Sequence, residues 1–270
     1  MEIAVCAADG ATHHHGLSSQ RLGLGLTYVG HATVLIAMDG LRVLTDPVLR
    51  QRVVHLRRRS GAPAPAVGSV DVVLLSHSHH DHLDRRSLAR LPRGTRIVAP
   101  RRLAGMLRRI GDLDVIGVDQ GDEVRIGRVR ISATHAEHDG TRRPLGRNAG
   151  ALGYLLQGES TVFFAGDTDL FEGMAAVGRA GIDLALLPIW GWGSRLGAGH
   201  MDPRSAAEAL RLLRPQVAVP IHWGTLAPAG LRSTRSGHSD APAAAFLQHA
   251  AELAPDVDVR IVPPGGSVQL

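Results

Sequence analysis

The fold of this chain is decided by the stretch Ser76-His77-Ser78-His79-His80-Asp81-His82, which carries the pattern H-x-H-x-D-H. The apolar run Val72-Val73-Leu74-Leu75 directly precedes it and is typical of a buried strand. Imidazoles and a carboxylate crowded at a strand end are costly to bury unless they coordinate an ion. The pattern therefore indicates a metal site at the C-terminal end of a strand, and a solvated histidine-rich loop is the alternative.

The spacing inside this stretch indicates that its side chains face two different metal sites. His77 and His79 are two residues apart, so an extended backbone points both imidazoles to the same side. Asp81 and His82 follow after the chain turns, and they can therefore face a neighbouring metal. His80 is the odd residue of the stretch and is expected not to ligate. The stretch thus predicts parts of two adjacent sites rather than one complete site.

The length and composition allow one large core. With 270 residues and 44% hydrophobic content, the sequence predicts a flexible arm over residues 1–23 and a single domain over 24–270. Cys6 is the only cysteine, which excludes an internal disulfide and a cysteine-based zinc site. The first residues lack the regions of a signal peptide, and no apolar run is long enough to span a bilayer. We therefore expect a cytoplasmic protein without integral membrane association.

The positive charge is carried by arginine alone. The net charge is +5, and all 30 basic residues are arginine, which indicates a composition bias rather than a nucleic-acid-binding protein. One segment, residues 50–59, is locally dense in arginine and contains Arg50, Arg52, Arg57, Arg58 and Arg59. A solvated loop is one interpretation of this segment. A phosphate-holding loop near the metals is the other, and it would suit a small anionic substrate.

Apolar runs separated by turn signals predict the order of strands and helices. Strands are expected over residues 26–29, 33–37, 41–44, 72–75, 96–99, 128–133, 151–156, 161–165, 184–187, 217–219 and 257–262. Helices are expected over about residues 85–91, 101–110, 170–180, 203–213 and 241–253, with Asp84 and Asp202 as caps. Strands come first, helices are then interspersed, and this order repeats. The pattern predicts an α/β (α+β) fold of two sheets packed face to face with helices outside.

Three further apolar runs are followed by residues of types that commonly bind metals. His135 ends the run that begins at residue 128, Asp167 follows the run Phe163-Phe164-Ala165-Gly166, and His222 follows Val217-Ala218-Val219-Pro220-Ile221. Each residue alone is readily explained as a cap or a turn residue. Because all of them sit just after an apolar run, as the first stretch does, we expect them to complete its metal sites.

These motifs resemble the metallo-β-lactamase superfamily over about residues 24–268. The branch containing L-ascorbate-6-phosphate lactonase and N-acyl-phosphatidylethanolamine phospholipase D is the most similar. The branch-level signs are Gly30-His31-Ala32, Thr45-Asp46-Pro47, Ala165-Gly166-Asp167-Thr168 and Pro220-Ile221-His222-Trp223-Gly224-Thr225. The resemblance implies a four-layer αββα sandwich, the metallo-β-lactamase fold.

The same resemblance implies a set of ligands for two divalent metal ions. It places His77, His79 and His135 on one ion, Asp81, His82 and His222 on the other, and Asp167 between the two. His138, three residues beyond the end of its strand, is the rival of His135. Zinc suits both donor sets, and manganese or iron would be tolerated at the oxygen-richer one.

Other residues are expected around these ligands. Asp46 is expected to support them by hydrogen bonding, as ligating imidazoles usually require. The resemblance places His200 near the metals in contact with substrate, with a loop histidine without a role as the alternative. His31 is expected to line the same cleft, and a histidine without a role is again the alternative. Asp81 has a second role as proton acceptor for the attacking water.

The chemistry that follows is metal-assisted hydrolysis. Two adjacent ions can hold a bridging water and lower its pKa, producing hydroxide at working pH. The precedents of the branch are phosphodiesters and phosphorylated lactones, and members of the branch often self-associate, so a homo-oligomer is consistent with the resemblance. The alternatives are a thioester hydrolase and a non-catalytic metal-binding or regulatory protein on the same scaffold.

Overall fold

The computed structural model describes residues 23–60, 68–109, 113–141, 148–190, 196–229 and 240–270. The arm expected over residues 1–23 lies outside this part of the chain, apart from residue 23. None of the described helices is both long and apolar enough to cross a lipid bilayer.

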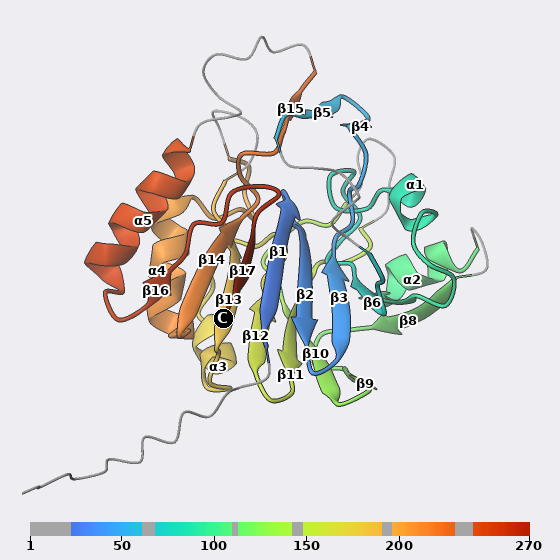
Figure 1. Ribbon diagram of the computed structural model, residues 1–270, viewed down its shortest axis with the longest axis horizontal. Helices are drawn as coiled ribbons and strands as arrows, with labels where there is room; N and C mark the ends of the chain where they lie inside the picture. Colours follow the sequence, from blue (N-terminus) through green and yellow to red (C-terminus); the bar gives the residue numbers. More distant parts are fainter. Residues whose placement is uncertain (1–22, 61–67, 110–112, 142–147, 191–195, 230–239) are drawn as a thin grey trace, which may run out of the picture.

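Two sheets of seven strands each pack face to face (Figure 1). The strands of the first sheet, in spatial order, are β17 (Ser267–Gln269), β1 (Gly25–Gly30), β2 (Thr33–Met38), β3 (Leu41–Thr45), β6 (Val72–Leu74), β7 (Arg96–Pro100) and β8 (Asp114–Val118). Those of the second sheet are β16 (Asp258–Val259), β14 (Val217–Ile221), β13 (Leu184–Pro188), β12 (Thr161–Phe164), β11 (Leu152–Gln157), β10 (Val129–His135) and β9 (Glu123–Ile126).

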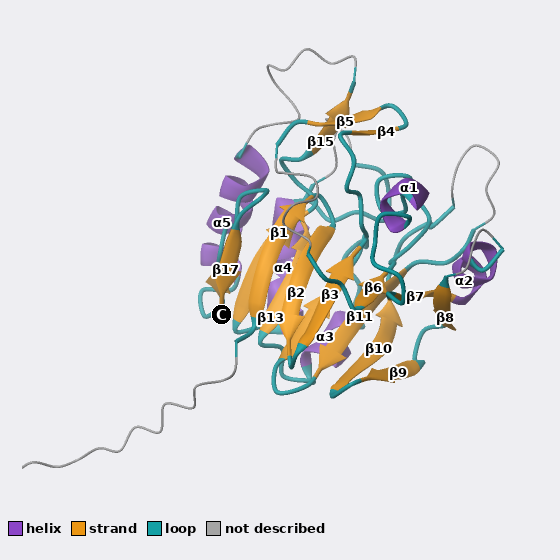
Figure 2. Cartoon of the chain, turned by 45° about the vertical axis from the view of Figure 1, so that its right-hand side comes forward, coloured by secondary structure: helices purple, strands orange, loops and turns teal. Residues whose placement is uncertain are grey.

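Helices cover the outer faces of the two sheets and complete four layers (Figure 2). The second sheet carries α3 (Met174–Gly178), α4 (Pro203–Leu213) and α5 (Ala241–Leu253). The first sheet carries α1 (Arg85–Leu88) and α2 (Arg101–Leu107). Large side chains that are almost fully buried, including Tyr28, Tyr154 and Phe164, belong to the core in which the two sheets meet. The αββα sandwich expected from the sequence is confirmed.

The directions of the strands bring one set of loops together. In the first sheet, β3, β6 and β7 are parallel, so the loops after β3 and β6 leave the same edge. In the second sheet, β12, β13 and β14 are parallel. Strand β10 runs in the same direction as β12, because each pairs antiparallel with β11. Every strand that precedes a proposed ligand therefore points to the same end of the sandwich.

A third, smaller sheet contains the arginine-rich segment. Strands β4 (Arg52–Val53) and β5 (Leu56–Arg58) form a hairpin that pairs with β15 (Leu226–Pro228) at the top of Figure 1. The interpretation as a solvated loop is wrong for Arg58, which is 4% exposed and donates to the main-chain oxygens of Val29 and Val48. Val53 and Leu56 of the hairpin are buried.

Several boundaries differ from the expected ones. Helix α1 ends at Leu88 rather than about residue 91, and Asp84 gives it no side-chain cap because its carboxylate binds Arg50 and Ser87. Helix α3 begins at Met174 rather than about residue 170. The last expected strand shortens to β16, and the sequence patterns did not predict β4, β5, β8, β9, β15 and β17. These are short strands at sheet edges or in the small sheet, where few residues are buried.

Helix α4 begins with a capping box that gives a testable contribution to stability. The Asp202 carboxylate accepts from the Ser205 amide at 2.8 Å, and the Ser205 hydroxyl accepts from the Asp202 amide at 2.9 Å. Replacing Asp202 by Ala leaves the Ser205 amide without this acceptor and should cost about 1 kcal/mol in the free energy of unfolding. Urea denaturation of both proteins measures the difference.

Asp240→Ala is the matched control, because Asp240 occupies the same position of α5 without a side-chain cap hydrogen bond. It should cost less than Asp202→Ala. Burial alone would raise the pKa of Asp202, but the hydrogen bonds from Ser205 and from the Arg204 amide together lower it in the folded state. The stability difference should therefore be complete at neutral pH and should shrink as the pH falls below about 4. Equal effects of both substitutions would contradict this role of the cap.

Candidate metal centre

Three imidazoles form the first group at the end of the sandwich. His77 and His79 follow β6, and His138 follows β10. One nitrogen from each ring lies within 4.8 Å of the others. His79 Nδ1 and His138 Nε2 are 3.3 Å apart, and the rings of His77 and His138 meet edge to face at 4.5 Å. These nitrogens are close enough to share one ion.

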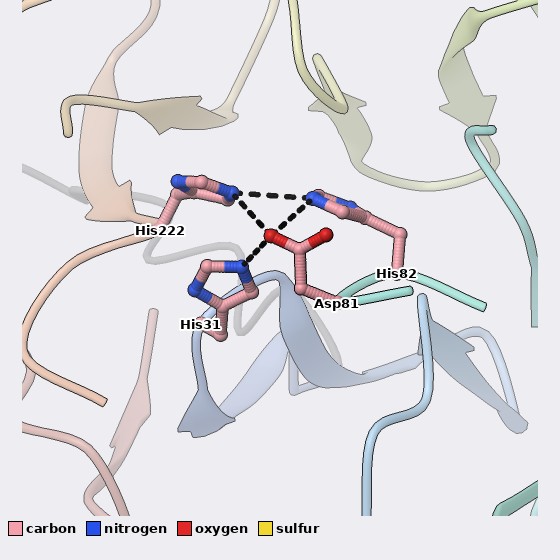
Figure 3. Close-up of side chains that lie close together, drawn as sticks. All are labelled: His31, Asp81, His82 and His222. Carbon is pink, nitrogen blue, oxygen red and sulfur yellow. Dashed lines mark hydrogen bonds and ion pairs between the residues drawn. The ribbon is translucent and has the colours of Figure 1, made fainter. Parts of the chain in front are cut away.

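Three imidazoles and a carboxylate form the second group (Figure 3). His31 follows β1, Asp81 and His82 follow β6, and His222 follows β14. His82 Nε2 lies 3.1 Å from His222 Nε2, and each of these nitrogens lies 3.9 Å from Asp81 Oδ2. Figure 3 shows the Asp81 carboxylate between the three rings. The second group therefore offers both nitrogen and oxygen donors.

The carboxylate of Asp167 contacts both groups. It follows β12 and is 3% exposed. Its Oδ2 lies 3.9 Å from His77 Nε2 in the first group and 3.0 Å from His82 Nε2 in the second. Its Oδ1 lies 3.3 Å from His222 Nε2. A single buried carboxylate thus occupies the position between two candidate metal sites.

Outer hydrogen bonds fix the orientation of five imidazoles. In each ring, one nitrogen forms a hydrogen bond with an oxygen outside the two groups, and the other nitrogen faces the remaining candidate ligands. The outer partners are Ser76 Oγ for His77, Thr141 O for His79, Asp46 Oδ2 for His82, Gly199 O for His138 and Trp190 O for His222. Metal-ligating histidines show this arrangement, because the outer bond fixes the tautomer and the direction of the ligating nitrogen.

Two buried atoms show that these residues fit a metal. His77 Nε2 and Asp167 Oδ1 are buried and have no hydrogen-bond partner within the described chain. Buried polar atoms are normally satisfied, so such atoms call for an explanation. Both atoms face the groups of nitrogen and oxygen donors described above. A divalent cation would satisfy them, and the donor set of imidazoles and carboxylates is one that divalent transition metals accept.

The pKa values of His77, His222 and Asp167 suit cation binding, whereas Asp167 and Asp81, against the effect of burial, raise the pKa of His82 well above its usual value. Burial lowers the pKa of His222 to about 3 and that of His77 well below its usual value, so both rings are neutral, as metal ligation requires. Burial alone would raise the pKa of Asp167, but the surrounding imidazoles, with hydrogen bonds from His200 and His82, hold it well below its usual value. The carboxylate therefore stays ionised and supplies negative charge between the two groups.

The structure does not bring His135 into the first group. His135 is the last residue of β10, its side chain is 41% exposed, and its ring nitrogens lie 3.3 Å from Gln120 and Glu137. Strand β10 ends at His135, two residues beyond the expected end at residue 133, so the chain bends toward the site only after His135. The rival residue, His138, occupies the position in the first group instead.

The packing around His138 explains why its place was hard to predict. Its Nδ1 bonds the oxygen of Gly199, and a Cβ at Gly199 would lie 3.0 Å from that nitrogen. Gly199 also has a φ of +82°, which glycine adopts without strain. A glycine directly before His200 was thus a signal of close approach, but its partner segment was not readable from the sequence.

The remaining expected residues lie at the site. Asp46 accepts from His82 Nδ1 at 2.7 Å and from the Ser76 amide at 2.7 Å, as expected for a supporting residue. His200 Nε2 lies 3.5 Å from Asp167 Oδ2, with its side chain 23% exposed. His31 is buried in the second group. His31, Asp46 and His222 all have positive φ, a strained conformation for residues other than glycine that Asp39, Val54 and Arg214 also adopt away from the site.

The fold and this site define a protein of the metallo-β-lactamase superfamily. Residues 41–223 match the family described as a Beta-lactamase superfamily domain. A "UPF0173 metal-dependent hydrolase" of Opitutus terrae is 37% identical over 208 residues, covering 74% of this chain and 85% of that protein. A protein of the same name from Rubrobacter xylanophilus is 32% identical over 255 residues, covering 90% of this chain and 95% of that protein. The chain belongs to this family of metal-dependent hydrolases.

A solved structure gives the same result. Igni18, described as a novel metallo hydrolase from the hyperthermophilic archaeon Ignicoccus hospitalis, matches with a TM-score of 0.70 at 25% identity. The match covers 92% of this chain and 98% of that chain. Family and fold therefore agree that this chain is a metal-dependent hydrolase.

The assignment of His138, rather than His135, to the first group can be tested with a matched pair of variants. His138→Ala removes a nitrogen that faces His77 and His79, so the protein should bind divalent metal more weakly and contain less of it. His135→Ala removes an exposed side chain and should leave the metal content unchanged. Metal analysis of both purified proteins after dialysis measures this. Retention of full metal by His138→Ala together with loss in His135→Ala would restore the original assignment.

Proposed function

We propose that this hydrolase uses two divalent metal ions. His77, His79 and His138 would hold one ion, Asp81, His82 and His222 would hold the other, and Asp167 would join them. The observation that carries the proposal is the position of the buried Asp167 carboxylate, which lies within 3.9 Å of nitrogens in both groups. Zinc suits both donor sets, and manganese or iron is acceptable at the second, which has more oxygen.

Such ions, when bound, lower the pKa of a water molecule and polarise a carbonyl or phosphoryl oxygen. The residues of the chain supply orientation and proton transfer. Asp46 fixes the ring of His82 through its Nδ1. Although burial opposes it, Asp167 raises the pKa of His200 above its usual value, so His200 holds a proton at Nε2 near the site. His200 is partly exposed and can donate that proton to a leaving group.

The proposed substrate is a small anionic molecule with a phosphodiester or lactone-type bond. All four segments that carry the resemblance to the lactonase and phospholipase D branch contribute to the site: His31, Asp46, Asp167 and His222 belong to one segment each. This convergence supports the precedents of that branch. The metal charge, rather than Arg50 or Arg58, would attract the anion, because Arg50 pairs with Asp84 and Arg58 binds main-chain oxygens.

A hydrolysis panel combined with metal analysis tests the proposal. The panel contains an activated phosphodiester, a lactone, a phosphorylated lactone and a thioester. About two metals per chain with turnover of the phosphodiester or a lactone is the expected result. Turnover of the thioester alone would contradict the substrate class. Full metal content without turnover of any compound would favour a non-catalytic metal-binding protein.

Removal of the joining carboxylate should abolish activity. Asp167→Ala takes away the oxygen atoms that contact both groups, so the protein should lose metal and turnover together. Asp169→Ala is the matched control, because the Asp169 carboxylate lies two residues away and accepts from the Leu170 amide instead. The control should keep both properties. If Asp167→Ala kept wild-type turnover with one ion or none, the two-metal proposal would be wrong.

A further inference from the structure

We infer that His31 is a positioning residue that holds the carboxylate of Asp81 in place for the second ion, and that His31 is not itself a ligand. The inference rests on the proposed function, because that proposal assigns Asp81 to the second ion. His31 lies among the second group with one nitrogen close to the other donors. The question is therefore whether it acts on the ion or on Asp81.

The hydrogen bonds of His31 differ from those of the five imidazoles assigned to the ions. Each of those rings bonds an outer oxygen with one nitrogen and turns the other inward. His31 does the reverse: its inward nitrogen, Nε2, lies 3.0 Å from Asp81 Oδ2, and none of the described residues accepts from its Nδ1. The inward nitrogen is thus used for Asp81, and the outer support that ligating imidazoles receive is missing.

The contact between His31 and Asp81 is shielded from water. The side chain of His31 is 2% exposed and that of Asp81 is 11% exposed. The ring of His31 also lies 3.8 Å from the ring of His222, measured between centroids, with 38° between the planes. His31 therefore contacts two members of the second group at once. A buried hydrogen bond to a carboxylate is stronger than an exposed one and restricts rotation of the carboxylate.

Two hydrogen bonds fix the backbone of His31 in a left-handed conformation. Its φ is +61°, its amide donates to Thr225 Oγ1 at 2.9 Å, and its carbonyl accepts from the His222 amide at 2.8 Å. A residue held in this region of φ costs free energy that the surrounding contacts must offset. The His222 amide ties the backbones of His31 and His222 together. Any displacement of His31 would therefore disturb both Asp81 and a ligand.

Gly30 and the buried Arg58 explain how this geometry is reached. A Cβ at Gly30 would lie 2.7 Å from Thr225 Cγ2 and 2.8 Å from Arg58 Nη1, so any other residue would displace these side chains, and the φ of +128° also favours glycine. Arg58 donates to the oxygen of Val29, the residue before Gly30. The arginine-rich hairpin thus fixes the segment that presents His31 to Asp81, which gives Arg58 a structural role.

The consequence is a measurable effect on the affinity of the second ion. Residues that support ligands through hydrogen bonds typically change metal affinity by about 10- to 100-fold when they are removed. His31→Leu removes the donor, and the affinity for the second ion should fall by about this factor, with the first ion unaffected. His31→Gln places an amide donor near the position of Nε2 and should recover most of the affinity. Both variants carry the same strain at positive φ.

The experiment titrates Zn²⁺ into the metal-free protein against a chromophoric chelator and records the visible spectrum of the Co²⁺-loaded protein. Wild type, His31→Leu and His31→Gln are compared, with His249→Gln on helix α5 as the control. Thermal unfolding in the presence of chelator checks that each variant folds. If His31→Leu does not fold, His31→Asn replaces it. Asparagine tolerates positive φ, but its amide is too short to reach the position of Nε2.

The results separate the alternatives. Weaker second-site binding in His31→Leu or His31→Asn, restored in His31→Gln with an unchanged Co²⁺ spectrum, supports positioning. Loss of the second ion in His31→Gln with a changed Co²⁺ spectrum would identify His31 as a ligand and overturn the inference. Wild-type affinity in His31→Leu or His31→Asn would also overturn it. A wild-type protein that binds only one ion would instead overturn the two-metal proposal, and this assignment with it.

Discussion

The carboxylate of Asp46 links the two groups of candidate ligands through hydrogen bonds. Its Oδ2 accepts from His82 Nδ1, and it also accepts from the hydroxyl of Ser76, whose oxygen bonds His77 Nδ1. One side chain that is fully buried thus sets the tautomer of an imidazole in each group. Without this carboxylate, His82 Nδ1 and the Ser76 hydroxyl would both lose their acceptor. The spacing of the remaining donors, including Asp167 between the groups, depends on these two rings.

The sandwich fold makes this arrangement possible because it brings strand ends from both sheets to one edge. Asp46 and the residues from His77 to His82 come from the first sheet, while His138, Asp167 and His222 come from the second. The apolar core between the sheets keeps the two sets at a constant separation. Rigid strands therefore position donors that lie far apart in the chain, and the positive φ values of Asp46 and His222 turn the chain sharply where the strands end.

The sequence predicted those parts of the fold and the site that follow from local patterns. Apolar runs located the central strands and the pattern after β6 located four donors, because burial and strand period act over a few neighbouring residues. The sequence predicted less well the positions of residues that are fixed by contacts between distant segments. His135 was preferred to His138 on the motif match, because the residues that hold His138 at the site, including His79 and Gly199, lie on other segments. The main-chain contacts of Arg58 were missed because its acceptors, Val29 and Val48, also lie on other segments.

The order of these residues along the chain has a consequence for biosynthesis. Every member of the first group precedes residue 139, whereas His222 and the strand β15 that pairs with the arginine-rich hairpin come near the C-terminal end. During translation, the first group is complete once His138 has been made, whereas the second group lacks His222 until much later, although Asp81 and His82 are made early. In the proposed two-metal centre, the second ion would have its full set of ligands only after His222, in the last third of the polypeptide, has been made, and a product terminated before it would carry an incomplete centre.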